Sequence, residues 1–498
     1  MSSDRRPHWP LILALAGVKF VFALYASGFY SYFRDELYYI ACGHHLDWGF
    51  VDHSPLVALY ARFGEWLSHG FGLRGFRFLA VVFGTARIVL TGVITARLGG
   101  NRAAQALACT AVLLAPIYLG IDSILSMNAA EHLFWLACIL VVIEIANGGS
   151  EKLWLLFGVL AGIGLQNKHS MVFLGFALTV ALLLTPLRRS LARPWIYLGG
   201  VLAVLLFLPN ILWQWQHGFP TLELLANVKN SGKNVVYGPL DFLKLQAMML
   251  HPFAAPVWIA GLIWLFRTPR YRILGWTYVI VLATFIWLQA KDYYVAPIYP
   301  MLFAAGAIWI SRSRLASVIA FVLVIAGGAM AVPLATPILP PQRYLAYQRA
   351  LGIEPAHAEV SHTSEMPQLF ADQFGWKEMV EKVAKFYHSL PPDVRAKTAI
   401  VGSNYGEAAA IDFYGKKYGL PPAISAHQSY WGWGYRGYTG ESVILIEDET
   451  DPNDWTTVQV VAQRSHPYAM PEENGPIFYC TGLRKPLAEL WPSLKVWR

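Results

Sequence analysis

The sequence has few charged residues for its length. Only 14% of its 498 residues are Asp, Glu, Lys or Arg, whereas soluble domains carry about 25%. This shortage argues against a disordered chain and against an ordinary cytosolic enzyme. The sequence also has only four cysteines, without metal-ligand spacing, which argues against a secreted disulfide scaffold.

Two further kinds of segment are missing. The sequence has no Lys/Arg-rich run and no aromatic–basic repeat, so a net charge of +8 does not indicate nucleic-acid binding. A basic surplus in a membrane protein usually reflects its topology instead. There is also no Gly-rich phosphate loop, which argues against a nucleotide-bound substrate.

The charge that is present is unevenly placed. Residues 1–334 contain 24 basic and 13 acidic residues, and residues 335–498 contain 15 basic and 18 acidic residues. With 56% hydrophobic residues and a mean hydropathy of +0.41 overall, the first part reads as an apolar, basic membrane domain. The sequence therefore predicts a transmembrane domain over 1–334 and a soluble domain over 335–498.

The apolar runs predict a polytopic α-helical membrane protein with about eleven transmembrane helices. A spanning helix needs about 20 mostly apolar residues. Such runs, the fifth of them short, occur at 9–28, 78–96, 103–121, 130–147, 153–167, 170–187, 195–213, 247–266, 273–289, 296–311 and 315–334. The first is too long for a signal peptide and no small-residue cleavage site follows it, so we expect it to be retained.

Lys and Arg orient these helices. With the N-terminus in the cytoplasm, every cytoplasmic connection of an eleven-helix topology carries at least one basic residue. The loops 29–77 and 214–246 and the domain 335–498 then lie on the outer side of the cytoplasmic membrane, in the periplasm or its equivalent. Amphipathic stretches such as 55–69 are expected in the membrane interface.

The outer domain has its own secondary-structure pattern. Residues 397–403 and 442–447 read as short buried strands and 406–417 as a helix, which predicts a small α/β domain. Cys480 lies in this domain and Cys42 in the first outer loop, so both would face an oxidising compartment and could pair. Their separation cannot be read from the sequence.

Several polar residues are not explained by topology. Lys168 and Lys291 fall at the outer membrane face, where they either snorkel to the interface or form an anion site for a lipid phosphate. Arg87 falls in the middle of the second span, where an ionised group is costly unless it faces water or is paired, with Glu131 or Glu144 as the candidate partners.

The first outer loop contains two acidic motifs. Asp35 and Glu36 follow the first span and are flanked by Arg34 and aromatic residues, an arrangement that suits a general base and equally suits a plain helix N-terminus. Asp52 and His53 come later in the loop. Two ligands are too few to define a metal site, so a positioning role is favoured and a divalent metal stays possible.

Together these segments resemble the family 39 and 83 glycosyltransferases of the GT-C fold, which are bacterial relatives of protein O-mannosyltransferases and of the enzyme that adds aminoarabinose to lipid A. Ser54 departs from the pattern, since many relatives have a second proline there. The motifs that carry the resemblance are Arg34-Asp35-Glu36-Leu37-Tyr38-Tyr39, Asp52-His53-Ser54-Pro55-Leu56, Ser126-Met127-Asn128, Asn167-Lys168-His169, Lys291-Asp292-Tyr293-Tyr294 with Pro297 and Pro300, Asn404-Tyr405-Gly406-Glu407, Phe413-Tyr414-Gly415 and Tyr418-Gly419-Leu420-Pro421-Pro422.

The resemblance implies inverting transfer of a sugar from a polyprenyl-phosphate donor to an envelope acceptor, which would be lipid A, another glycolipid, a polysaccharide or a protein. It makes Asp35 the general base and gives Glu36 the task of orienting it. The other residues with implied roles are Lys168, Lys291, Tyr293 and Tyr294 at the donor phosphate, and Arg34, Asp52, His53, Arg87 and His169 lining the cavity.

Two other hypotheses for the function compete with glycosyl transfer. A transporter or lipid-linked-sugar flippase would also be polytopic with intramembrane charges, but no internal repeat of the helices is visible in the sequence. A non-catalytic partner in an envelope complex would be favoured by degraded positions at Asp35 and Lys168, and both are intact. The identities of the sugar and of the acceptor, and the oligomeric state, stay open.

Overall fold

The structure is a computed structural model that describes residues 6–232, 235–354 and 364–498. The chain forms two compact units. One contains Met1–Phe29, Leu67–Trp213 and Val236–Pro340, and the other contains Tyr30–Trp66, Gln214–Val235 and Pro341–Arg498. Much of both outer loops, predicted as part of the domain 1–334, therefore belongs to the unit that holds the C-terminal domain. We call them the helical unit and the mixed unit.

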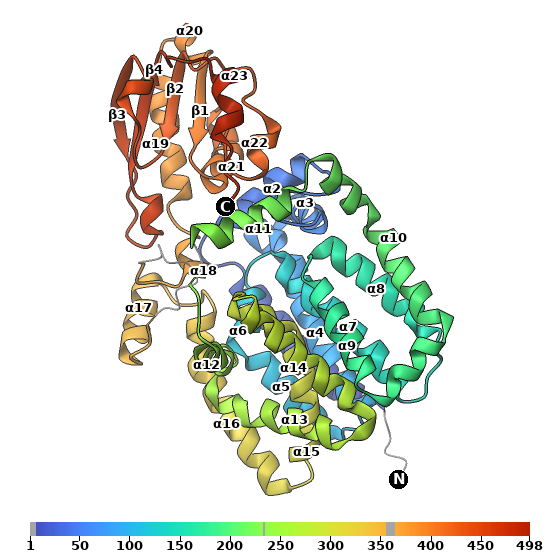
Figure 1. Cartoon of the computed structure of the whole chain (residues 1–498). Coiled ribbons are helices and arrows are strands. Elements are labelled where there is room, and N and C mark those ends of the chain that lie inside the picture. The colour runs from blue at the N-terminus through green and yellow to red at the C-terminus, as the bar shows by residue number, and fades with distance from the viewer. Residues whose placement is uncertain (1–5, 233–234, 355–363) are drawn as a thin grey trace. The chain divides into compact units, whose positions relative to one another are not determined.

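The helical unit consists of apolar helices (Figure 1). Its helices are α1 (Trp9–Ala26), α4 (Phe78–Arg97), α5 (Arg102–Leu114), α6 (Pro116–Ile121), α7 (Met127–Ala146), α8 (Leu153–Asn167), α9 (Met171–Leu183), α10 (Pro194–Gln216), α12 (Pro239–Met249), α13 (Ala255–Arg267), α14 (Arg272–Trp287), α15 (Tyr299–Ile310) and α16 (Arg314–Ala335), with the 3-10 turns η1 (Pro186–Ala192), η2 (Pro252–Ala254), η3 (Pro269–Tyr271) and η4 (Asp292–Ile298). α10 ends in the mixed unit.

In the described residues, six helices are long and apolar enough to cross a membrane: Trp9–Ala26, Phe78–Arg97, Met127–Ala146, Pro194–Gln216, Asp292–Ile310 and Arg314–Ala335. Two bent pairs raise the number to eight, namely Met171–Leu183 with Pro186–Ala192 and Pro239–Met249 with Pro252–Arg267. The predicted polytopic helical fold is confirmed. Each predicted span overlaps a helix, and the count of eleven crossings stays a prediction.

Close helix packing in this unit depends on small residues. α13 and α15 approach each other at Gly261 and Gly306, and a Cβ atom at Gly306 would lie 1.8 Å from the carbonyl oxygen of Val257. Such a contact is far inside van der Waals distance, so any larger residue at 306 would push the two helices apart. Small residues that let helix backbones approach are typical of packing inside membranes.

The mixed unit contains a four-stranded sheet in the order β1-β2-β4-β3, formed by β1 (Thr398–Gly402), β2 (Ser442–Ile446), β3 (Thr457–Gln463) and β4 (Pro476–Thr481). β1 and β2 are parallel, with Ile400 opposite Ile444, and the other pairs are antiparallel. The parallel pair requires a crossover, which α21 (Tyr405–Tyr414) supplies. The predicted α/β domain, with strands near 397–403 and 442–447, is confirmed.

The remaining elements of the mixed unit are helical. α2 (Arg34–His44) packs along α21, and α3 (Leu56–Phe76), whose backbone breaks at Gly72 with φ 59°, continues into the helical unit. The others are α11 (Pro220–Ser231), α17 (Pro341–Ala350), α18 (Gln368–Ala371), α19 (Trp376–Ser389), α20 (Pro392–Arg395), α22 (Ser429–Trp433) and α23 (Leu487–Leu490), with the 3-10 turns η5 (Gly415–Tyr418), η6 (Pro452–Asp454), η7 (Pro471–Glu473) and η8 (Trp491–Leu494).

The four cysteines are buried free thiols. Cys42 on α2 has its sulfur 3.6 Å from Nε2 of His53, whereas Cys480 lies in β4 opposite Val443. The pairing of Cys42 with Cys480, which the sequence left open, is not formed in the structure.

Candidate active site

The two acidic residues at the start of α2 have different roles. Glu36 is the third residue of the helix, is fully buried, and accepts a hydrogen bond of 2.9 Å from the backbone N–H of Phe33. It thereby satisfies an N–H group that the helix leaves without a partner. Because this carboxylate is used by the backbone, Glu36 supports the helix end on which Asp35 stands.

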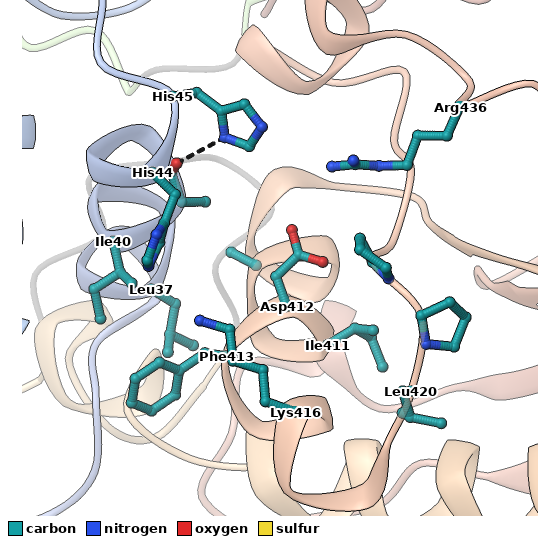
Figure 2. Close-up of a pocket in the computed structure, with 14 residues that line it drawn as sticks. Leu37, Ile40, His44, His45, Ile411, Asp412, Phe413, Lys416, Leu420 and Arg436 are labelled. Atoms are coloured by element: carbon teal, nitrogen blue, oxygen red, sulfur yellow. Dashed lines mark hydrogen bonds between the residues drawn. The ribbon is translucent and has the colours of Figure 1, made fainter.

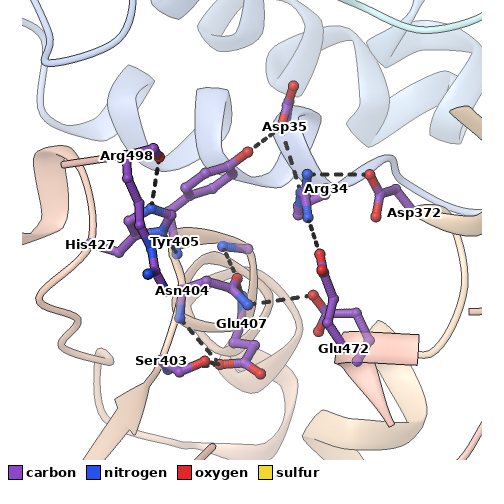
Figure 3. Close-up of polar contacts among 12 residues, drawn as sticks. Arg34, Asp35, Asp372, Ser403, Asn404, Tyr405, Glu407, His427, Glu472 and Arg498 are labelled. Carbon is purple, nitrogen blue, oxygen red and sulfur yellow. Dashed lines mark hydrogen bonds and ion pairs between the residues drawn. The ribbon is translucent and has the colours of Figure 1, made fainter. Parts of the chain in front are cut away.

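Asp35 has a different environment. Its carboxylate accepts a hydrogen bond of 2.7 Å from the hydroxyl of Tyr405, at the start of α21, and its side chain is 32% exposed (Figure 3). The Tyr405 ring is stacked on His427, with centroids 5.1 Å apart, and lies 4.6 Å from the ring of Tyr38. Asp35 is thus held by a buried aromatic group while one side stays open to solvent, as a proton acceptor requires.

A second carboxylate lies next to this group. Asp52 accepts a hydrogen bond of 3.0 Å from the hydroxyl of Tyr38, whose oxygen lies 2.8 Å from the hydroxyl oxygen of Ser429. Burial raises the pKa of Asp52, against the opposing effect of His53. Nε2 of the buried His53 lies 4.0 Å from the Asp52 carboxylate.

These contacts bear on the possible metal site. In the part of the chain that the structure describes, no group of three or more His, Cys, Asp or Glu side chains could hold a metal ion. Asp52 and His53 therefore have no third protein ligand there. The positioning role of Asp52 and His53 stays a prediction.

Arg34 fastens the start of α2 to the C-terminal part of the mixed unit. Its guanidinium lies 3.4 Å from the carboxylate of Asp372 and 2.8 Å from that of Glu472, and its backbone N–H donates to the carbonyl of Asp372 at 3.0 Å (Figure 3). Burial alone would lower the pKa of Arg34, but Asp372 and its other neighbours outweigh that effect and raise it. Arg34 is therefore a permanent cation that positions its neighbour Asp35.

The burial of Asp372 makes folding depend on pH. Burial raises the pKa of Asp372 from 3.8 to about 7, with Arg34 opposing the rise. The folded state thus binds a proton more tightly than the unfolded state does, so stability that is present at low pH is lost as the pH rises towards 7. One pKa unit corresponds to about 1.4 kcal/mol, so the loss approaches 4 kcal/mol.

We expect Asp372→Asn, which resembles the protonated carboxyl, to remove this pH dependence. The thermal unfolding midpoints of wild type and variant in detergent, measured from pH 4.5 to pH 8, should be closest at the acid end and diverge towards pH 8, with the variant the more stable. Curves that stay parallel across this range would show that Asp372 does not titrate there.

The helix that carries Tyr405 is fixed by a buried ionic network. Asn404 caps α21 and Glu407 completes the capping box. Glu407 is also bound by the guanidinium of Arg464 at 2.5 Å, and burial raises the pKa of Glu407 to about 7 against the effect of Arg464. The spacing Asn404-x-x-Glu407 is a helix-start signal visible in the sequence, whereas its link to Asp35 is a tertiary contact.

In the helical unit, Lys168 lies close to two other residues that are predicted to bind the donor phosphate. Its ammonium group lies 4.6 Å from the ring centroid of Tyr294 and 5.8 Å from that of Tyr293. It also donates hydrogen bonds of 2.8 Å to Glu131 and to Asn128. The sequence did not anticipate the ion pair with Glu131, which holds the side chain of Lys168 in one place with 14% of its surface exposed.

Arg87 is paired, but not as predicted. Its guanidinium binds the carboxylate of Asp122, donates to Nδ1 of His132 at 2.6 Å, and lies 4.4 Å from the ring centroid of Tyr118. The expected partners are otherwise engaged: Glu131 pairs with Lys168, and Glu144 pairs with Arg97 at 3.0 Å. Asp122 is the partner in place of Glu131 or Glu144 because it directly follows α6 and is buried beside Arg87.

Asp122 also binds Lys19 of α1 at 2.6 Å, and both side chains are almost fully buried. A lysine in the middle of an apolar helix near the N-terminus is the signal in the sequence for this pair. Lys19, Asp122 and Arg87 therefore tie α1, α4 and the end of α6 together. All three side chains are almost fully buried, and the predicted place of Arg87 in the cavity lining stays a prediction.

The two remaining predicted residues, His169 and Lys291, are each close in sequence to a member of the Lys168 group. His169 contacts Asn210 through Nε2 at 3.2 Å, and Lys291 directly precedes η4, which contains both tyrosines of the Lys168 group. Arg34, Asp35, Glu36, Asp52 and His53 lie in the mixed unit, whereas Lys168, Lys291, Tyr293, Tyr294, Arg87 and His169 lie in the helical unit. The structure thus brings the predicted residues together in two groups, and their union in one cavity stays a prediction.

Comparisons with known proteins agree with this architecture. Residues 52–213 match the dolichyl-phosphate-mannose-protein mannosyltransferase family. The fold matches crystal structures of ArnT from Cupriavidus metallidurans. With undecaprenyl phosphate bound, the TM-score is 0.62 at 12% identity, covering 95% of this chain and 99% of that one. For the apo state, the TM-score is 0.60 at 13% identity, covering 98% of each. A search of curated proteins gave no match.

Proposed function

We propose that the chain is an inverting glycosyltransferase of the GT-C type, family 39/83, since residues 52–213 match the dolichyl-phosphate-mannose-protein mannosyltransferase family and the fold matches that of ArnT. In this proposal it transfers a sugar from a polyprenyl-phosphate donor to an envelope acceptor on the outer side of the cytoplasmic membrane. The observation that carries the proposal is the placement of Asp35, whose partly exposed carboxylate is fixed by Tyr405 at the start of α2.

Asp35 is the general base. It removes the proton from the acceptor hydroxyl as that oxygen attacks the anomeric carbon, and the polyprenyl phosphate leaves with the electrons of the broken C–O bond. A single displacement of this kind inverts the anomeric centre and needs one base. Glu36 cannot readily serve in its place, because it is fully buried and bonded to the backbone of Phe33.

The donor phosphate is assigned to Lys168, Lys291, Tyr293 and Tyr294. An ammonium group and two phenols can stabilise the negative charge that grows on the leaving phosphate. One structural neighbour, ArnT from Cupriavidus metallidurans, was crystallised with undecaprenyl phosphate bound, which supports a lipid-phosphate donor for this fold. Arg34, Asp52 and His53 position the base, and His169 lies beside Lys168 in the sequence.

The proposed orientation places the working face outside. We expect a reporter that is active only in the cytoplasm to be silent when fused after Arg498, and one that is active only outside to give signal. The reason is that an odd number of crossings from a cytoplasmic N-terminus ends outside. A fusion after Arg193, in a predicted cytoplasmic connection, is the control and should behave in the opposite way. Strong cytoplasmic signal at Arg498 would contradict the orientation.

The experiment that tests the proposed function is a mass-spectrometric comparison of envelope glycolipids, polysaccharides and proteins from cells with the wild-type chain and with Asp35→Asn. A glycosyl unit present only with the wild type identifies both sugar and acceptor. Identical profiles, with both proteins present in equal amounts and the donor lipid available, would contradict it.

A further inference from the structure

A pocket of about 220 Å³ lies between α2 and α21 in the mixed unit (Figure 2). One wall is α2, which contributes Leu37, Ile40 and His44 at the spacing of one helix face. Phe413 and Leu420 contribute further apolar surface. Successive residues of a helix turn by about 100°, so this face of α2 points away from Asp35, which lies two residues before Leu37. The pocket is therefore separate from the general base.

Two cations border the pocket with hydrogen-bonding capacity to spare. Arg436 uses Nε to donate to the carbonyl of Ala423 at 3.3 Å, and within the described residues its terminal amino groups make no hydrogen bond. Lys416 has a side chain that is 61% exposed, and the nearest carboxylate oxygen to its ammonium group, on Glu65, is 4.0 Å away. Lys416 thus has a long ion pair with Glu65 and Arg436 acts electrostatically on Asp412, while both cations keep N–H groups that can donate to a ligand anion.

The two histidines of the pocket differ in whether both ring nitrogens already have a partner. His44 is occupied, since Arg62 donates to its Nδ1 at 2.8 Å and its Nε2 lies 3.0 Å from Glu65. His45 is held by a stack on Trp433, with centroids 4.1 Å apart, and its Nδ1 donates to the carbonyl of Ala41 at 3.0 Å. In the neutral ring this leaves Nε2 as an acceptor for a hydroxyl group.

Asp412 adds an acceptor to the same space. Figure 2 shows its carboxylate between the His45 ring and the Arg436 guanidinium. The backbone N–H of Ala423 and the hydroxyl of Tyr430 each donate to it at 2.8 Å, which fixes its orientation. A carboxylate oxygen accepts two hydrogen bonds, so Asp412 can still receive one from a ligand hydroxyl.

We infer that this pocket binds an acidic sugar unit, meaning a single sugar ring that carries a phosphate or a carboxylate. The ring hydroxyls bond to Asp412 and His45, the anionic substituent binds Arg436 and Lys416, and the apolar face of the ring lies against Phe413. A simple anion would not use Asp412, and an uncharged sugar would not use the two cations. The volume favours one ring, because pockets for drug-sized ligands measure about 300–1,000 Å³.

This inference deepens the proposed function and rests on it for its biological meaning. The pocket would hold an acidic unit of the acceptor glycan while another unit is presented to Asp35, nine residues and about 13 Å along the axis from His44. The binding itself does not depend on catalysis. It can be measured without any donor, so a failure of the pocket and a failure of the transfer reaction can be told apart.

The test is saturation-transfer NMR on the full-length protein in phosphatidylcholine nanodiscs, with glucose 6-phosphate, glucuronic acid and glucose as ligands and inorganic phosphate as competitor. We expect the two acidic sugars to bind at least about 10-fold more tightly than glucose, and phosphate to compete only at roughly 10-fold higher concentration. Arg436→Gln and Lys416→Gln should each weaken binding by about 10-fold or more, the loss expected for one charge-assisted bond. Asp35→Asn should bind like wild type.

Lys417→Gln is the matched control, because Lys417 is next to Lys416 in the chain but does not line the pocket. Its ammonium group lies over the ring of Tyr418 instead, 5.6 Å from the centroid. It should change affinity by less than about twofold. Wild-type affinity in Arg436→Gln with an unchanged unfolding midpoint would overturn the inference, as would equal weakening by Lys417→Gln. Displacement of glucose 6-phosphate by phosphatidylglycerol in the nanodisc would also overturn it, by showing a site for lipid headgroups.

Discussion

Asp35→Asn should leave the protein folded and able to bind donor while lowering its turnover by about 10²- to 10⁴-fold, the usual cost of removing a general base. Asn keeps the shape of the side chain and can still accept the hydrogen bond from Tyr405, so the start of α2 should not move. The loss should therefore appear in kcat. Single-turnover transfer from a polyprenyl-phosphate sugar, with donor binding measured on the same preparation, gives both quantities.

Glu36→Gln is the control for this prediction. Gln can cap a helix from the same position, so the bond to the backbone of Phe33 persists and the variant should lose far less activity than Asp35→Asn. Near-normal turnover by Asp35→Asn, in a preparation free of wild-type enzyme, would remove Asp35 from the mechanism. The base would then have to be sought at Asp52, which lies beside the same tyrosines.

The second large effect is expected at the donor phosphate. Lys168→Ala and Lys291→Ala should each weaken donor use by about 10- to 150-fold, because a hydrogen bond to a charged group contributes about 1.5–3 kcal/mol. The effect should appear as a raised KM for the donor lipid, measured by transfer rates across donor concentrations. Lys152→Ala, at the other end of α8 and over the ring of Trp195, should be neutral.

Lys168 also compensates the buried carboxylate of Glu131, so its removal affects folding as well. The double variant Lys168→Ala with Glu131→Gln removes both charges and separates the two roles. We expect it to regain stability but not donor use. Recovery of wild-type donor use in the double variant would make Lys168 a structural residue. Wild-type rates in both single variants would exclude both lysines from the donor site.

Periodic features of the chain could be predicted from the sequence. Apolar runs of about 20 residues located the helices, and the paired strands β1 and β2 were visible as short apolar segments. The acidic pair at 35–36 is visible in the sequence as two adjacent carboxylates flanked by Arg34 and aromatic residues in the first outer loop. The different roles of the two residues could not be predicted, because the capping by Glu36 and the exposure of Asp35 depend on where α2 begins.

Contacts across large sequence separations could not be predicted. Tyr405 reaches Asp35 across 370 residues, and Asp372 reaches Arg34 across more than 300. Nothing in a single sequence selects these partners from other tyrosines and aspartates. Arg87 shows the same limit at short range, since three carboxylates lay within reach along the chain and only packing selects Asp122.

The most direct measurement of the central claim is the release of free polyprenyl phosphate from a polyprenyl-phosphate sugar by the purified protein in vesicles that contain acceptor. A glycosyltransferase breaks the bond between sugar and phosphate, so free polyprenyl phosphate should appear in proportion to the glycosylated acceptor, and Asp35→Asn should abolish both. A transporter or flippase would move the donor lipid between leaflets with that bond intact. Donor that changes leaflet without any release of polyprenyl phosphate would contradict the account.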